Sequence, residues 1–224
     1  MGMATTRKSR PKASADAAGI RSAYQEYVLT EGKAPASVFK FCKHIGIPEK
    51  DFYQHYGSFE SIDRAIWAGY AQTVQSHLES DSNFAALSAR EKILTYYFAL
   101  AEVLASERSY VVYRLKSCQL PTMPPAFLKD FRSAFESWIS AVLNEGKQAG
   151  DVATRPYLDN RYHHLFWLHL MFILQFWIHD DSAHFEHTDA AIEKSVNLAF
   201  DLVGKGVLDN AIDLGKFLYQ HARN

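Results

Sequence analysis

The apolar positions of this chain recur every three or four residues along most of its length. The clearest stripe has intervals of 4, 4, 3 and 4 and places five side chains on one helix face: Phe127, Phe131, Phe135, Trp138 and Val142. Such spacing is typical of an amphipathic helix, and no segment shows the strict alternation of a strand. We therefore predict an all-α protein of about nine or ten helices.

Capping residues and glycines divide the first 80 residues into four predicted helices. Their expected limits are Ser14 to Glu31, Ser37 to Gly46, Pro48 to Tyr56, and Ser58 to Glu79. Serine is a good N-cap, and a proline at the start of a helix loses no hydrogen bond because its missing N–H would have no partner there. The second and third helices are short and meet at a tight glycine turn. This arrangement is the helix-turn-helix unit, whose second helix enters the DNA major groove.

The remainder of the chain reads as longer helices. Ser88 and Glu91 form a capping box that opens a helix to about Glu107. Further helices are expected at 109–118, from the Phe127 stripe to closing glycines at Gly146 and Gly150, at 158–180, and at 188–223 with a break near Gly204 and Gly206.

The segment 165–178 is apolar on every face of its predicted helix. It is shorter than the roughly 18 residues that a bilayer span requires, so we predict no membrane span. A helix that is apolar all round needs neighbours on all sides, and a chain of this size has few to offer. We therefore expect one face to meet a second copy, in a two-fold homodimer built from helices 158–180 and 188–205.

Charge is balanced overall but uneven along the chain. The 24 Lys and Arg residues face 25 Asp and Glu residues, and the formal net charge is -1. Residues 1–12 nevertheless carry four basic residues and no acid: Arg7, Lys8, Arg10 and Lys12. We predict a disordered basic arm at 1–13, of the kind that contacts nucleic acid.

Several classes of protein are disfavoured by what the sequence lacks. Cys42 and Cys118 are too few for a disulfide framework, and the N-terminal residues lack the apolar stretch of a signal peptide, so we expect a cytoplasmic protein. No phosphate-binding glycine loop, nucleophile elbow or cysteine nucleophile motif is present. We therefore expect neither an enzyme nor a bound cofactor.

The segment from Ser37 to Tyr56 resembles the TetR family of bacterial regulators. Gly46-Ile47 matches the family's turn, and Phe52-Tyr53-Gln54-His55-Tyr56 matches the end of its recognition helix. The resemblance implies a DNA-binding domain over 14–60, joined through helix 58–79 to a ligand-binding and dimerisation domain over 61–224. It also implies a palindromic DNA operator as partner, and a role as repressor.

The resemblance and the side-chain chemistry together give the DNA-contacting residues. Family analogy places Ser37, Tyr53 and His55 at phosphates, and Lys50, Asp51 and Gln54 nearest the bases. A glutamine can read adenine through two hydrogen bonds. Since phosphate neutralisation supplies most non-specific affinity, Lys40, Lys43 and the basic arm are expected to provide it. Phe52 and Tyr56 are expected to be core residues.

Two positions depart from the family pattern and leave a second interpretation open. Asp51 stands where the family has a small hydroxyl residue, and Phe59 replaces a phosphate-binding lysine. Residues 48–56 sum to -1, with Lys50 against Glu49 and Asp51. The alternative is a protein of the same fold that has lost specific DNA binding and acts as a lipid- or isoprenoid-binding accessory module, similar to the lipid-binding protein of mitochondrial coenzyme-Q synthesis.

The larger domain is rich in aromatic residues, and the resemblance implies that it senses a small molecule. The whole chain has fifteen Phe, twelve Tyr and four Trp, more than ordinary packing needs, and most of them lie after residue 90. An apolar pocket with a few polar groups is the usual form of a ligand site. We predict a hydrophobic or aromatic effector. The residues expected to line its site are Tyr97, Tyr113, Phe131, Phe135, Trp138, Phe166, His169 and Phe172.

The sequence contains ten histidines, and some of them are candidate metal ligands. A transition-metal site could be built after the apolar helix, from His179, Asp180, Asp181, His184 and His187. However, their spacing fits no strong motif, and a polar helix end has this composition without a metal. We therefore predict no metal site, and His169 is expected to be a hydrogen-bonded core or pocket residue.

Overall fold

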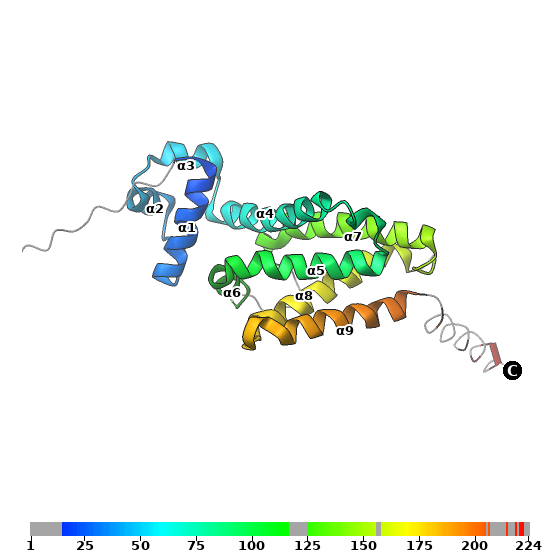
Figure 1. The fold of residues 1–224 in the computed structure, drawn as a ribbon. Coiled ribbons are helices and arrows are strands. Elements are labelled where there is room, and N and C mark those ends of the chain that lie inside the picture. The colour runs from blue at the N-terminus through cyan, green and yellow to red at the C-terminus, as the bar shows by residue number, and fades with distance from the viewer. Residues whose placement is uncertain are drawn as a thin grey trace, which may run out of the picture. The chain divides into compact units, whose positions relative to one another are not determined.

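A computed structural model describes residues 15–116, 125–155 and 158–204, together with Gly206, Leu214, Leu218, Gln220 and His221. These residues hold nine α-helices and four short 3₁₀-helices, with no strand among them (Figure 1). The α-helices are α1 Ala17–Glu31, α2 Val38–Ile45, α3 Glu49–His55, α4 Phe59–Ser80, α5 Ala89–Ser106, α6 Arg108–Lys116, α7 Lys129–Ala149, α8 Tyr162–His179 and α9 Glu186–Val203. The prediction of an all-α fold is confirmed.

Some sequence predictions lie outside the described residues. These are the basic arm 1–13, the predicted helix end at Cys118, and the stretch after Gly206 as a helix.

The predicted helix starts follow the capping residues closely. The Ser37 side chain accepts a hydrogen bond from the Lys40 N–H at 3.2 Å, and Ser88 and Glu91 form the expected capping box at the start of α5. The first helix begins later than predicted. Its N-cap is Asp16, whose carboxylate accepts from the Gly19 N–H at 2.7 Å. An aspartate satisfies an orphan N–H as well as a serine does, so either residue type marks a helix start.

The chain divides into two compact units within α4, the first ending at Ile66 and the second beginning at Trp67. The boundary expected at residue 60 lies slightly before this division. The core of the first unit is aromatic. The ring of Phe41 contacts those of Tyr24, Phe52 and Phe59, with centroids 5.5–6.2 Å apart. Phe59, which departs from the family pattern, also stacks on Tyr24 at 5.5 Å, so it is a packing residue of this unit.

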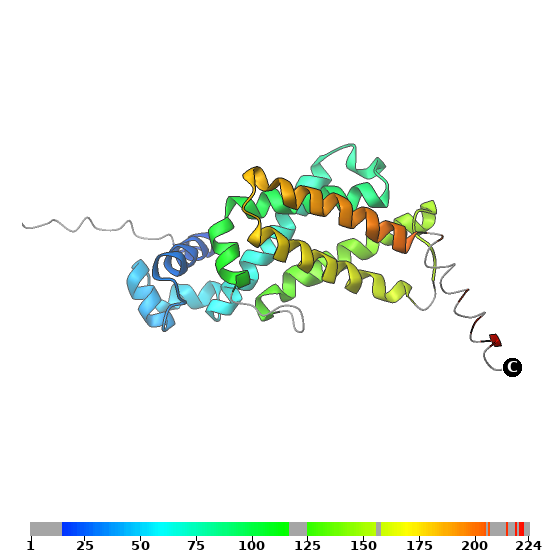
Figure 2. The ribbon, with the colours of Figure 1, turned by 90° about the horizontal axis from the view of Figure 1, so that it is seen from below.

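In the second unit, four helices form a closed ring in which each packs against two neighbours (Figures 1 and 2). α5 contacts α7 and α9, and α8 contacts the same two helices from the other side. Their inward faces bury large aromatic and aliphatic side chains, including Tyr96, Tyr97, Phe135, Trp167 and Phe200. The second unit is therefore built around this four-helix bundle, whose interior is rich in aromatic rings.

Gly146 and Gly150 are predicted to close the helix after Phe127, and this prediction is confirmed for Gly150 and wrong for Gly146. Gly146 lies buried inside α7, which continues to Ala149 and ends at Gly150, a residue with φ of 89°. A Cβ atom on Gly146 would lie 2.7 Å from Ala89 Cβ and 2.9 Å from Val152 Cγ2. The glycine is thus required for the close approach of α5 and the segment after α7, and not for a turn.

Replacing Gly146 with alanine is expected to lower the free energy of unfolding by about 1–3 kcal/mol, because the new methyl group overpacks a rigid contact. Gly69→Ala is the matched control. Gly69 lies inside α4, and a Cβ there meets nothing within 4 Å. Alanine at that site should raise stability by about 0.5–1 kcal/mol through helix propensity. Urea unfolding at fixed protein concentration measures both. Equal effects of the two substitutions would contradict the overpacking explanation.

Candidate functional site

The turn between α2 and α3 has the geometry that its glycine predicts. Gly46 adopts φ of 76°, a left-handed conformation that costs a glycine nothing. Its N–H donates to the carbonyl of Cys42 at 2.9 Å, and the N–H of Ile47 donates to the same carbonyl at 3.1 Å. Pro48 then precedes α3. The two short helices are locked together by this turn and by the contact between Phe41 and Phe52.

The predicted DNA-contacting residues all lie on the outer side of this unit. Seven are exposed (Ser37, Lys40, Lys43, Lys50, Tyr53, Gln54 and His55), and Asp51 is half-buried. Tyr53 is 54% exposed, which is high for a large aromatic side chain. Ser37 also caps α2, but its hydroxyl can accept from Lys40 N–H and still donate its own proton to a phosphate.

The inner side of α3 is occupied by the two predicted core residues. Phe52 is fully buried, and Tyr56 is buried with its hydroxyl engaged by α1. The Tyr56 O–H donates to the Ala17 carbonyl at 3.0 Å, and the Arg21 guanidinium donates to the Tyr56 oxygen at 3.0 Å. The prediction that Phe52 and Tyr56 are core residues is confirmed. They fix α3 on α1, so that the opposite face is free to contact another molecule.

Two carboxylates reduce the positive charge of this surface. Glu49 and Asp51 lie in the first turn of α3, where the helix dipole favours negative charge. Burial raises the pKa of the Cys42 thiol, and the negative charges of Glu49 and Asp51 raise it further. The two carboxylates therefore offset part of the positive charge that Lys40, Lys43 and Lys50 bring to this exposed face.

In the second unit, the residues predicted to line a ligand site fall into three groups. Tyr97, Phe131, Phe135 and Phe166 are buried, whereas Tyr113, Trp138 and His169 are half-buried and Phe172 is exposed. The structure brings most of the set together. Phe135 contacts Tyr97 and Trp138, and His169 contacts Tyr97 and Phe166. This cluster is called the aromatic core below.

A polar chain crosses the aromatic core. The His169 Nδ1 lies 3.2 Å from the Tyr97 hydroxyl, and its Nε2 lies 2.8 Å from the Ser195 Oγ. The Tyr97 O–H also donates to the Phe166 carbonyl and the Ser195 O–H to the Ile192 carbonyl, both at 3.3 Å, so each hydroxyl beside the His169 ring has a second acceptor. Burial lowers the pKa of His169 to about 4, so the ring is neutral at pH 7. Ser195 was missed by the sequence analysis. The only feature of the sequence that points to Ser195 is that a small polar residue falls among the apolar positions of α9.

One buried polar atom of the aromatic core has no partner among the described residues. The Tyr96 hydroxyl is fully enclosed and makes no hydrogen bond there, and its ring stacks on Trp138 with centroids 4.3 Å apart. Burial raises the pKa of Tyr96, so the hydroxyl keeps its proton. An unsatisfied buried hydroxyl costs about 1–3 kcal/mol, which a ligand oxygen or a water molecule would recover.

Phe172, also predicted to line the ligand site, lies apart from the aromatic core. It lies on an outward face of α8 with three other large apolar side chains: Leu165, Leu168 and Phe176. Their spacing of 3, 4 and 4 residues forms one stripe, and Leu198 and Leu202 extend exposed apolar surface onto α9. Helix α8 is largely apolar on every face, but the rest of the same chain covers only some of those faces. These six residues are called the α8–α9 apolar surface below.

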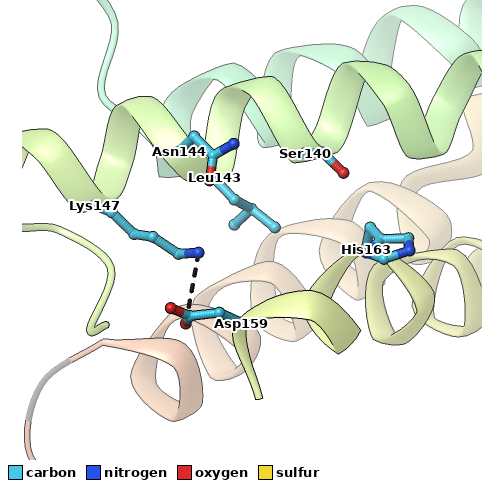
Figure 3. Close-up of a pocket in the computed structure, with 6 residues that line it drawn as sticks. All are labelled: Ser140, Leu143, Asn144, Lys147, Asp159 and His163. Carbon is cyan, nitrogen blue, oxygen red and sulfur yellow. Dashed lines mark ion pairs between the residues drawn. The ribbon is translucent and has the colours of Figure 1, made fainter. Parts of the chain in front are cut away.

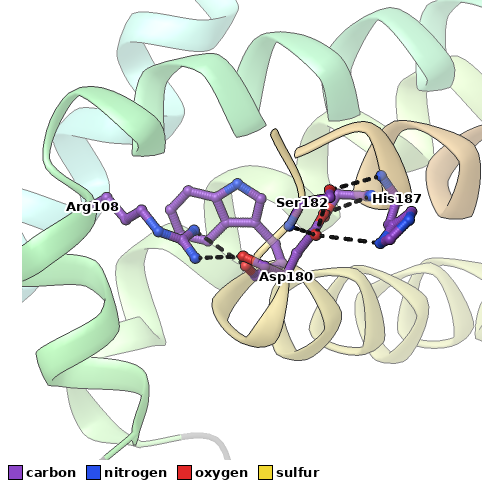
Figure 4. A network of polar contacts seen from close by, with 6 residues as sticks. Arg108, Asp180, Ser182 and His187 are labelled. Carbon is purple, nitrogen blue, oxygen red and sulfur yellow. Dashed lines mark hydrogen bonds and ion pairs between the residues drawn. The ribbon is translucent and has the colours of Figure 1, made fainter. Parts of the chain in front are cut away.

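Of the residues considered as metal ligands after α8, Asp180 has other partners. The Asp180 carboxylate accepts two hydrogen bonds from Ser182, at 2.6 and 2.9 Å (Figure 4). It accepts two more from Thr188, at 2.6 and 2.8 Å. Arg108 donates to the carbonyls of Trp177 and Asp180, at 3.1 and 3.0 Å, and its guanidinium lies 4.4 Å from the Trp177 ring. This network joins the end of α8 to the start of α9.

Comparison with known proteins finds a family model that matches the larger unit. Residues 92–218 match the model of the tetracyclin repressor-like C-terminal domain. A search of curated proteins finds no significant match. No helix in the described part of the chain combines the length and the hydropathy that a bilayer span requires.

Solved structures share the fold at low sequence identity. A putative TetR-family regulator from Shewanella sp. PV-4 is 12% identical with a TM-score of 0.58, covering 80% of this chain and 95% of that one. The regulator FadR from Bacillus subtilis, solved with stearoyl-CoA, is 14% identical with a TM-score of 0.57, covering 84% and 97%. A TetR-family regulatory protein from Rhodococcus RHA1 is 20% identical with a TM-score of 0.54, covering 85% and 98%.

Proposed function

Because the chain belongs to the TetR family of transcriptional regulators, we propose that it is a homodimeric repressor that binds a palindromic operator and is released by a hydrophobic small molecule. The observation that carries the DNA-binding part is the helix-turn-helix unit. Its Gly46 turn and buried Phe52 fix α3, while Tyr53, Gln54 and His55 stay exposed at its C-terminal half. Polar aromatics and an amide at these positions suit phosphates and base edges.

The proposed dimer is supported by the α8–α9 apolar surface. Four of its side chains are at least half exposed, with Leu198 at 60% and Phe172 at 53%. Large exposed apolar patches mark interaction sites in soluble proteins. A second copy is the occupant we propose, because a two-fold contact covers the same surface on both chains at once. A dimer also supplies two recognition helices for the two halves of a palindrome.

The proposed effector site is the aromatic core. Its rings favour an apolar or planar molecule, and the Tyr97–His169–Ser195 chain together with the unpartnered Tyr96 hydroxyl offers a few polar contacts. FadR was solved with an acyl-CoA, which is consistent with a long apolar effector in this fold. Such a molecule would release DNA only if it favours the state that binds DNA less tightly.

The test is fluorescence anisotropy of the full-length protein on DNA from its own upstream region, with a random duplex as control, at low and near-physiological salt. We expect binding to the upstream DNA to exceed binding to the random duplex at both salt concentrations. Binding that is equal on both duplexes and disappears at higher salt would contradict the proposal. The module that binds lipid or isoprenoid without reading DNA would then be favoured, in agreement with the net charge of -1 over residues 48–56.

Removing the carboxylate of Asp51 is expected to strengthen binding to a random duplex. Asp51→Asn deletes a negative charge close to phosphates, and one unit charge near a surface changes the energy by about 1 kcal/mol, or roughly fivefold in affinity. The gain should shrink as salt screens the charge. Glu102→Gln removes the same charge from the exposed surface of α5 and serves as control. Unchanged affinity of Asp51→Asn for the random duplex would show that Asp51 does not face DNA.

A further inference from the structure

Two helices of the larger unit bring three metal-binding side chains together. Glu136 lies on α7, and His163 and His164 lie in the first turn of α8. One ligand atom from each residue falls within 4.8 Å of the other two. Donor atoms around one transition-metal ion lie about 3–4 Å apart, given metal–ligand bonds of about 2.0–2.2 Å. Only small side-chain adjustments separate the present arrangement from a coordinated one.

The cluster is held in place by its own contacts. The Glu136 Oε1 lies 2.9 Å from the His164 Nδ1 and accepts from the Arg132 Nε at 2.8 Å. The two histidine rings have centroids 3.9 Å apart. The Arg132 Nη2 lies 3.4 Å from the same His164 Nδ1, and the His164 Nε2 takes no part in these contacts.

Space for additional ligands lies beside the cluster. A cavity of about 310 Å³ is lined by His163 together with Ser140, Leu143, Asn144, Lys147 and Asp159 (Figure 3). At the end of the cavity away from His163, Lys147 and Asp159 form an ion pair at 3.5 Å. A polar cavity of this size holds several water molecules, which can complete the coordination of an ion that has only three protein ligands.

We propose that Glu136, His163 and His164 form a binding site for a divalent transition-metal ion of the Zn²⁺ class. Two imidazoles and one carboxylate favour Zn²⁺, Co²⁺ or Ni²⁺ over Mg²⁺ and Ca²⁺, which prefer oxygen ligands. Water from the cavity fills the remaining positions. The ion would tie α7 to the start of α8. This site is separate from the histidine-rich segment after α8, whose Asp180 is fully engaged with Ser182 and Thr188.

The test uses tag-free, full-length protein, because a polyhistidine tag would itself bind the probe. Zn²⁺ binding is measured by competition with a chromophoric chelator, and Co²⁺ is added to read the coordination geometry from its visible absorption. We expect one Zn²⁺ per chain, a raised melting temperature with Zn²⁺, and an intense Co²⁺ band typical of four-coordinate nitrogen and oxygen ligation. Variants His163→Gln, His164→Gln and Glu136→Gln should each weaken Zn²⁺ binding by at least about tenfold.

The control is His179→Gln, which removes an exposed histidine from the end of α8. It should bind Zn²⁺ as the wild type does. Circular dichroism of each variant without metal verifies the fold. Glu136→Gln keeps an oxygen for Arg132, so at least one ligand variant retains the local contacts. Wild-type affinity no tighter than millimolar, a ratio of one ion per two chains, or equal losses in His179→Gln and the cluster variants would overturn the assignment.

Discussion

Replacing Leu168 and Phe172 together with aspartate is expected to turn the protein into a monomer and to weaken operator binding by about a hundredfold or more. Both side chains lie in the middle of the exposed stripe of α8, and about half of each is exposed in the single chain. In a two-fold interface each substitution occurs twice, so four carboxylates enter one apolar contact. Burying an unpaired carboxylate costs far more than burying the original side chain contributes.

The loss of DNA affinity follows from the loss of the second recognition helix. A dimer places both helix-turn-helix units on one palindrome, and the second contact is effectively intramolecular. Linking two binding modules in this way raises affinity by about 10²–10⁴-fold without any new contact. The monomer keeps α3 and its exposed residues unchanged, so it should still bind a random duplex with the weak affinity of one unit.

The measurement combines sedimentation equilibrium with operator anisotropy, at protein concentrations on both sides of the dimer transition. Phe98→Asp is the control, since Phe98 is an exposed aromatic residue on α5, outside the α8–α9 apolar surface. It should leave the dimer intact. A double variant that remains dimeric, or a wild type that is monomeric while binding the operator tightly, would show that α8 does not form the interface.

The features that local chemistry controls could be predicted from the sequence. Ser37 and Ser88 mark true helix starts, and Gly46 and Gly32 end helices in the left-handed conformation. A cap acts through hydrogen bonds within three or four residues, so its signal is contained in a short segment. Phe52 and Tyr56 are buried as expected, and their four-residue spacing, also a local feature, places them on one face of the helix.

Features that depend on residues distant in the sequence could not be predicted. Gly146 looks like a helix end, but its role is set by Ala89, which the fold brings against it. Arg155 is buried, and its guanidinium donates to the Tyr162 hydroxyl and to the carbonyls of Leu202, Val203 and Gly204 at the end of α9. Free carbonyls at a helix C-terminus attract a cation. Nothing near position 155 in the sequence identifies its partners.

The backbone conformation of the connection between α8 and α9 also could not be predicted from the sequence. His184 and Phe185 both adopt positive φ, 53° and 61°, although neither is a glycine. Such a backbone costs of order 1 kcal/mol or more per residue and persists only where tertiary contacts compensate. The compensation comes from the Phe185 ring, which lies 4.4 Å from the Arg108 guanidinium and 5.8 Å from the Trp177 ring. The candidate metal ligands were missed for a similar reason, because Glu136 meets His164 only after α7 packs on α8.

The Asp180 carboxylate beside this connection is expected to contribute about 3 kcal/mol to stability at pH 7. Its side chain is completely buried and accepts from the N–H and O–H groups of both Ser182 and Thr188. Replacing Asp180 with alanine leaves buried donors of Thr188 without a partner, and each unsatisfied buried donor costs about 1–3 kcal/mol. Asp181→Ala removes the neighbouring exposed carboxylate and should change stability by less than about 0.5 kcal/mol.

The contribution of Asp180 should depend on pH in a defined direction. Burial acts to raise the pKa of its carboxyl group, but the hydrogen bonds from Ser182 and Thr188 outweigh burial and hold the pKa well below its usual range. A group whose pKa is lower in the folded state stabilises the protein above its unfolded pKa of about 3.9. That stability is lost as the pH falls from about 4 toward the folded value. The His187 ring, 3.8 Å away, adds attraction where it is protonated.

Urea unfolding of the wild type and Asp180→Asn between pH 3 and pH 7, at one protein concentration, tests this dependence. The asparagine keeps one acceptor oxygen but cannot ionise, so the stability difference between the two proteins should be largest at pH 5–7 and should shrink below pH 4. A difference that stays constant down to pH 3 would mean that the shape of the Asp180 side chain, and not its negative charge, stabilises the connection between α8 and α9.

Because α8 and α9 both carry the apolar surface proposed for the dimer, weakening their connection should also lower dimer affinity at neutral pH. Asp180→Asn would then make the melting temperature more dependent on protein concentration than that of the wild type.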